Sequence, residues 1–131
     1  MKILVADDDE ALLNMIAFKL KKENFGEVFT ATDGKTARQI VEEEAPDIIV
    51  TDILMPYCSG LELISFVRNE LQRNTPIITL SVVGLEDTVL EAFELGANDF
   101  MSKPFNLPEL LIRIRRAMAL VRDTMGHTHA A

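Results

Sequence analysis

The chain has 131 residues, a length typical of one domain, and its 48% hydrophobic and 26% charged residues indicate a globular protein rather than a disordered one. Its net charge of -8 argues against direct binding of nucleic acid or of anionic membrane surfaces, because phosphate groups carry the same sign. The sequence has no apolar stretch near the roughly 18 residues of a membrane span, no signal-peptide layout, and one cysteine, which excludes an internal disulfide, so we expect a cytoplasmic protein without membrane contact.

Five short apolar runs alternate with longer segments in which apolar residues recur at the spacing of one helix face. The runs lie at residues 3–6, 28–31, 47–51, 77–81 and 99–102. The helical segments follow them at residues 12–20, 37–41, 61–71, 89–93 and 107–121. The pattern therefore predicts a strand followed by a helix, five times over.

This alternation predicts an α/β fold with a mostly parallel sheet and helices on both of its faces. The runs are apolar throughout instead of alternating with polar residues, as expected of strands that are covered on both sides. The apolar period stops near Arg122. We therefore expect one domain over residues 1–122, with residues 123–131 forming a tail or the start of a linker.

Polar side chains stand at the carboxyl ends of four predicted strands. The first strand ends in Asp7, Asp8 and Asp9, and the third, fourth and fifth lead into Asp52, Ser81 and Lys103. Ligands of open α/β sheets bind at this edge. Crowded carboxylates repel one another unless a cation or a proton relieves the repulsion, and a site built from oxygen ligands suits Mg²⁺ or Mn²⁺ better than Zn²⁺. Such an ion beside a hydroxyl and an ammonium is suited to handling a phosphoryl group.

Each of these residues also has a structural explanation when it is taken alone. Asp9 is better explained as a helix cap than as a metal ligand. Ser81 alone fits a turn at a strand end, Lys103 alone fits a solvated surface, and Asp52 alone fits a turn as well as a site. Their coincidence at four strand ends favours a functional site.

Motifs in residues 3–9, 47–56 with Gly60, 76–81 and 96–105 stand in the order and at the separations of a known family. Over residues 2 to about 121 the chain resembles the receiver domain of two-component response regulators. The resemblance implies a flavodoxin-like, doubly wound sheet of five parallel strands in the order 2-1-3-4-5. It also places Asp7, Asp8 and Asp52 at the switch point between the first and third strands.

The resemblance also implies a role for each site residue. Asp52 would be the phosphoacceptor, attacking a phosphohistidine of a sensor histidine kinase or phosphotransfer protein. Asp7, Asp8, Asp52 and the backbone carbonyl of Leu54 would hold Mg²⁺, while Lys103 and Ser81 would contact phosphoryl oxygens. The domain would catalyse only its own phosphorylation and dephosphorylation, so it would not be an enzyme in the usual sense.

A switch is expected to carry the signal away from the site. By resemblance, Ser81 moves toward the phosphoryl group and Phe100 rotates inward, although Phe100 also fits a plain core position. The face formed by the fourth helical segment, the fifth strand and the last helix would then control an output domain or effector protein. The resemblance further implies a cis peptide bond before Pro104.

Three charges on that face, Asp99, Glu109 and Arg113, resemble those used by one large subfamily for dimerisation on phosphorylation. The match is partial, because Val89 replaces a basic residue and Asn98 replaces an acid. The alternative is that Val89, if exposed, belongs to an apolar patch for a partner.

The loops around the predicted site also depart from the usual pattern. Val82 replaces the common Ala or Gly after the switch hydroxyl, and Leu54 and Val83 stand where polar residues are frequent. Tyr57 and Cys58 are unusual in their loop, where Cys58 is better explained as a small apolar filler than as a reactive thiol.

Two other kinds of function compete with this interpretation. An interaction module could keep the fold and work without phosphate, but the five intact residues Asp7, Asp8, Asp52, Ser81 and Lys103 argue against it. A metal-dependent phosphatase with an aspartyl nucleophile commonly keeps a second acid two residues after the nucleophile, where this chain has Leu54.

Overall fold

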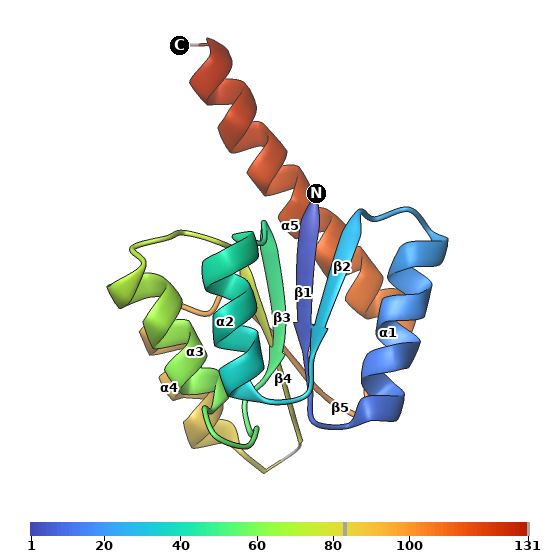
Figure 1. The fold of residues 1–131 in the computed structure, drawn as a ribbon, viewed down its shortest axis with the longest axis vertical. Coiled ribbons are helices and arrows are strands. Elements are labelled where there is room, and N and C mark those ends of the chain that lie inside the picture. Colours follow the sequence, from blue (N-terminus) through green and yellow to red (C-terminus); the bar gives the residue numbers. More distant parts are fainter. Residues whose placement is uncertain (83, 131) are drawn as a thin grey trace.

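The computed structural model describes residues 1–82 and 84–130. Its strands are β1 (Lys2–Ala6), β2 (Glu27–Ala31), β3 (Ile48–Asp52), β4 (Ile77–Val82) and β5 (Asp99–Lys103). They form one sheet of order β2-β1-β3-β4-β5 in which every pair is parallel (Figure 1). The predicted five-stranded, flavodoxin-like α/β fold is confirmed, with strand ends shifted by at most one residue.

The helices are α1 (Glu10–Lys22), α2 (Gly34–Glu44), α3 (Gly60–Ser65), α4 (Glu86–Leu95) and α5 (Leu107–Ala130), and a π-helical turn, η1 (Phe66–Glu70), directly follows α3. The helical backbone of α5 runs through most of residues 123–131, whose role as a tail or linker stays a prediction. In the described part of the chain, no helix combines the length and apolar character that a membrane crossing requires.

Two hydrophobic cores lie on opposite faces of the sheet. One packs α1 and α5 against the sheet through residues such as Ile16 and Ile114, and the other packs α2, α3 and α4 through residues such as Val41 and Ile64 (Figure 1). All residues of β3 are buried, in agreement with its unbroken apolar run. Burying each large aliphatic side chain contributes roughly 1.5–3 kcal/mol, so the two cores hold the carboxyl ends of β1 and β3 firmly in place.

Candidate functional site

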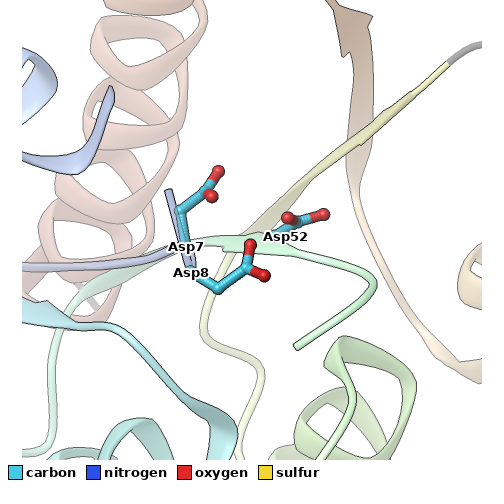
Figure 2. Close-up of side chains that lie close together, drawn as sticks. All are labelled: Asp7, Asp8 and Asp52. Atoms are coloured by element: carbon cyan, nitrogen blue, oxygen red, sulfur yellow. The ribbon is translucent and has the colours of Figure 1, made fainter. Parts of the chain in front are cut away.

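Three carboxylates meet at the carboxyl edge of the sheet. Asp7 and Asp8 directly follow β1, and Asp52 is the last residue of the neighbouring strand β3. One oxygen from each of the three lies within 4.8 Å of the others, and Figure 2 shows the side chains gathered at the strand ends. Asp7 is fully buried, Asp52 is 7% exposed and Asp8 is open to solvent. The cluster that the sequence predicts is therefore formed, with a buried floor and an open side.

Lys103, the last residue of β5, brings a cation into this cluster. Its ammonium Nζ lies 2.7 Å from Asp7 Oδ2 and donates a hydrogen bond of 3.0 Å to Asp52 Oδ2. Asp7 Oδ2 is buried and accepts no well-directed hydrogen bond from the described residues, so its compensation comes from the close ion pair with this ammonium. Asp7 Oδ1 accepts a 2.9 Å hydrogen bond from the backbone N–H of Asp9. The peptide bond between Lys103 and Pro104 is cis, the isomer that the family resemblance implies.

The environment changes the pKa of both partners of the ion pair. Burial raises the pKa of the Asp52 carboxyl, and the Asp7 charge adds to this, although the hydrogen bond and charge of Lys103 oppose it. Burial also opposes the charge of Lys103, but hydrogen bonding and attraction from Asp7 and Asp52 together outweigh it and raise the Lys103 pKa. For Asp52, desolvation thus outweighs the stabilisation of its charge by Lys103.

Ser81 lies at the same edge of the sheet but does not contact the carboxylates. It is buried near the end of β4, where Asp52 is registered with Leu80, and its hydroxyl donates to the carbonyl of Val82 at 3.2 Å. Its side chain would have to turn away from this carbonyl in order to reach a group on Asp52.

Apolar side chains stand around the mouth of the cluster. Leu54 is 55% exposed and Val82 is 51% exposed, and the N–H of Leu54 donates a long, 3.4 Å hydrogen bond to Asp52 Oδ1. Val83 lies outside the described residues. Tyr57 projects into solvent from a backbone with φ of 70°. Leu54 and Val82 thus form an apolar rim at this edge of the sheet.

Two residues near the site have structural roles. The side chain of Asp9 caps α1, accepting a 3.1 Å hydrogen bond from the Leu12 N–H, as the cap interpretation predicts. Cys58 is buried, and its carbonyl would lie 1.7 Å from a Cβ added at Gly34. Cys58 therefore fills the tight contact between the β3–α3 loop and the start of α2, and burial raises the pKa of its thiol.

A groove of about 410 Å³ lies between α4 and β5. Phe100 is half-buried and lines it, together with Val82, Val89, Leu90 and Phe93. Val89 lines this apolar groove and is half-buried against the core, and its neighbour Leu90 is the exposed residue. The successive apolar residues Val89 and Leu90 indicate an apolar patch on this helix, but the sequence does not show which of the two faces solvent.

The three charges expected at a dimer contact form pairs within the chain. Arg113 on α5 contacts Asp99 Oδ1 at 2.6 Å and Glu109 Oε1 at 2.9 Å, and it also donates to the carbonyl of Phe100 at 2.8 Å. The hydrogen bond to Glu109 raises the pKa of Arg113, and the hydrogen bond to Asp99 and the charges of both acids add to this, although burial opposes it. This network ties α5 to β5 on the face that includes the groove.

Comparisons with known proteins agree with this geometry. The family model described as response regulator receiver domain matches residues 3–115. The receiver domain of Francisella response regulator 1452 is 35% identical, with a TM-score of 0.79 over 94% of this chain and 98% of that chain. The chemotaxis response regulator CheY4 of Vibrio cholerae is 32% identical, with a TM-score of 0.80 over 88% and 97%. NtrX of Brucella abortus is 26% identical, with a TM-score of 0.88 over 99% of this chain but 29% of that longer chain.

Proposed function

The chain belongs to the response regulator receiver domain family, so it is a phosphoacceptor signalling domain and not a true enzyme, and we propose that Asp52 is its phosphoacceptor. One observation carries this proposal: Asp52 combines a near-buried carboxylate with an ammonium at 3.0 Å and two further acids beside it. Asp7 also pairs with this ammonium but is fully buried, whereas Asp52 keeps 7% of its surface exposed at the open side of the cluster.

The transfer itself needs little from the protein beyond position and charge. A carboxylate oxygen of Asp52 attacks the phosphorus of a phosphohistidine, an O–P bond forms as the P–N bond breaks, and the imidazole leaves with the electron pair. The Lys103 ammonium stabilises the negative charge of the transferred phosphoryl oxygens, since its Nζ already contacts Asp52. Ser81 supplies a hydroxyl hydrogen bond to another phosphoryl oxygen after it releases the Val82 carbonyl.

The acidic cluster suits a divalent metal, and we propose Mg²⁺, with Mn²⁺ as a substitute. The donors are hard carboxylate oxygens, and Asp7 Oδ2 is buried without a directed hydrogen bond, so a second cation would relieve it. Asp7, Asp8, Asp52 and the backbone carbonyl of Leu54 would hold the ion. When bound, the ion offsets negative charge on the phosphoryl oxygens.

The groove between α4 and β5 supports an output role for the face that it forms with α5. We place Ser81 and Phe100 in the switch, because Phe100 is half-buried at the groove and can turn inward when Ser81 moves away. Receiver domains interact with histidine kinases and output domains. For this chain, the proposed partners are a sensor kinase or phosphotransfer protein at the acidic cluster and an output domain or effector at the α4–β5–α5 face, in the cytoplasm. Release of the Arg113 pairs would allow a homodimer on phosphorylation.

The proposal is tested by intact mass after incubation with acetyl phosphate and Mg²⁺. Wild type should gain one phosphoryl group, and Asp52→Asn should gain none. Asp87→Asn, on the exposed side of α4, serves as the matched control and should load as wild type does. A full mass gain that persists in Asp52→Asn would overturn the assignment.

A further inference from the structure

The N-terminal end of helix α4 has few stabilising contacts. Leu85 precedes the helix and provides no side-chain hydrogen bond to it among the described residues. The adjoining Gly84 has a φ of 101°, and an added Cβ there would meet open space. Within α4 only Ala92, in the C-terminal half, is fully buried. The end of α4 that lies nearest to Ser81 therefore has few restraints.

The opposite end of α4 is held by an arginine from another element. Gly96 ends the helix with a left-handed φ of 119°, and its N–H donates to the carbonyls of Ala92 and Phe93. The Gly96 carbonyl accepts two hydrogen bonds from Arg68, from Nε at 3.1 Å and Nη2 at 2.9 Å. A Cβ at Gly96 would lie 2.8 Å from Arg68 Nε, so the two residues pack as closely as glycine allows.

The remaining donors of Arg68 also bind neutral oxygens. Nη2 donates to Asn98 Oδ1 at 2.9 Å, and Nη1 donates to the carbonyl of Arg73 at 2.9 Å. Asn98 Oδ1 in turn accepts from the Ile77 N–H at 2.8 Å, which links the cluster to the start of β4. Burial lowers the pKa of Arg68, and no carboxylate of the described residues forms an ion pair with it. The planar guanidinium thus serves to position backbone and not to balance charge.

Arg68 itself is anchored to the phosphoacceptor strand. It lies in η1, which continues α3, and α3 and α4 are neighbours on one side of the sheet (Figure 1). At the start of α3, the Gly60 N–H donates to the Ile53 carbonyl at 2.7 Å, and a Cβ on Gly60 would lie 2.3 Å from the Asp52 carbonyl oxygen. The α3–η1 segment therefore connects the backbone around Asp52 with the C-terminal end of α4. π-helical turns such as η1 are rare and occur frequently at functional positions.

We propose that Arg68 is a positioning residue that makes the Gly96 end of α4 a fixed pivot, so that phosphorylation moves only the end of α4 beside Ser81. The groove wall formed by Leu90 and Phe93 then tilts about this pivot, and the start of β5 stays in place. The pivot is a property of the resting chain, whereas the restricted movement rests on the proposed phosphorylation of Asp52.

Hydrogen exchange of the full chain, with and without acetyl phosphate and Mg²⁺, tests both parts. In Arg68→Met, exchange at the Gly96, Ala97 and Asn98 amides should rise about tenfold or more, because without the Arg68 bonds to the Gly96 carbonyl and the Asn98 side chain this segment opens more often. Gly96→Ala should raise exchange at the same amides by pushing Arg68 away. Arg73→Met removes a neighbouring guanidinium that bonds to Val41 on α2, and it should leave these amides unchanged.

The response to loading separates positioning from general stability. On loading, wild type and Arg73→Met should change exchange only over residues 85–91, whereas Arg68→Met should change it along all of α4 to Asn98. Intact mass checks loading in each variant. If wild type takes no phosphoryl group, the proposed function fails, and the resting comparison still decides on the pivot. If Arg68→Met loads normally and its exchange matches wild type in both states, the pivot is refuted.

Discussion

Replacing Lys103 by methionine should destabilise the fold strongly at neutral pH, because it removes the cation and keeps the shape of the side chain. The Lys103 side chain is 17% exposed, and its Nζ contacts the fully buried Asp7 and the near-buried Asp52. The pKa of Lys103 is raised, so its stabilising contribution is complete at pH 7 and is lost only as the pH rises through the raised value, above 10.5.

The size of the effect is bounded from two sides. Breaking a buried ion pair by removing one partner costs about 3–5 kcal/mol. A carboxyl can instead take up a proton, which at pH 7 costs about 4 kcal/mol for an ordinary pKa of 3.8. We therefore expect a loss of about 3 kcal/mol in the free energy of unfolding. The loss should shrink by up to about 1.4 kcal/mol per pH unit as the pH falls, because the unpaired acid then becomes protonated.

Urea unfolding at pH 7 and pH 5 measures this loss. Lys19→Met is the matched control, since Lys19 pairs with Glu23 on the surface at 3.4 Å and should contribute less than about 1 kcal/mol. Millimolar Mg²⁺ should stabilise Lys103→Met more than wild type, because the pocket without its ammonium attracts a cation more strongly. Equal losses in the two variants at pH 7, or a loss in Lys103→Met that is the same at both pH values, would refute the reasoning.

Further predictions concern Asp52 and the rim around it. The pKa of Asp52 is raised in the folded state, so ionising this carboxyl lowers the free energy of unfolding as the pH rises from 3.8 through the raised value. Asp52→Asn should therefore be more stable than wild type at pH 7 and equally stable at pH 3. A stability advantage of the variant that grows toward acid pH would contradict this sign. Val82→Ala should load faster from acetyl phosphate, because two methyl groups leave the mouth of the site, as measured by mass at timed intervals. Leu54→Asn should lose its phosphoryl group faster, because an amide can hold an attacking water where leucine shields the approach; rates equal to those of wild type would exclude the apolar rim as a barrier.

Much of the fold and the position of the site follow from local patterns in the sequence. Short apolar runs such as residues 48–50 are typical of a parallel strand that is covered on both faces, and parallel strands bring their carboxyl ends to one edge of the sheet. Asp7 and Asp52 could therefore be placed together before any distance was known.

Other features depend on side-chain geometry that no local pattern contains. The register of β4 and β5 places Lys103 opposite Val82, yet its reach to Asp7 across two strands depends on its rotamer. The Ser81 hydroxyl donates to the Val82 carbonyl, a choice of partner that depends on its rotamer and not on the sequence pattern. On α4 only one residue is fully buried, so periodicity does not define the buried face of this helix, and the sequence could not tell which of Val89 and Leu90 faces solvent.

The charge count of the acidic cluster has a consequence for which cation it can take. Asp7, Asp8 and Asp52 carry three negative charges when ionised, and Lys103 returns one, so the pocket holds two in excess. A divalent cation brings this local charge to zero, whereas a monovalent cation leaves one negative charge and a trivalent cation leaves one positive charge. A phosphoryl group on Asp52 adds one further negative charge, and the neutral assembly becomes an anion. This additional negative charge then has to be stabilised by dipoles of the protein, and the hydroxyl of the buried Ser81 is such a dipole at that edge of the sheet.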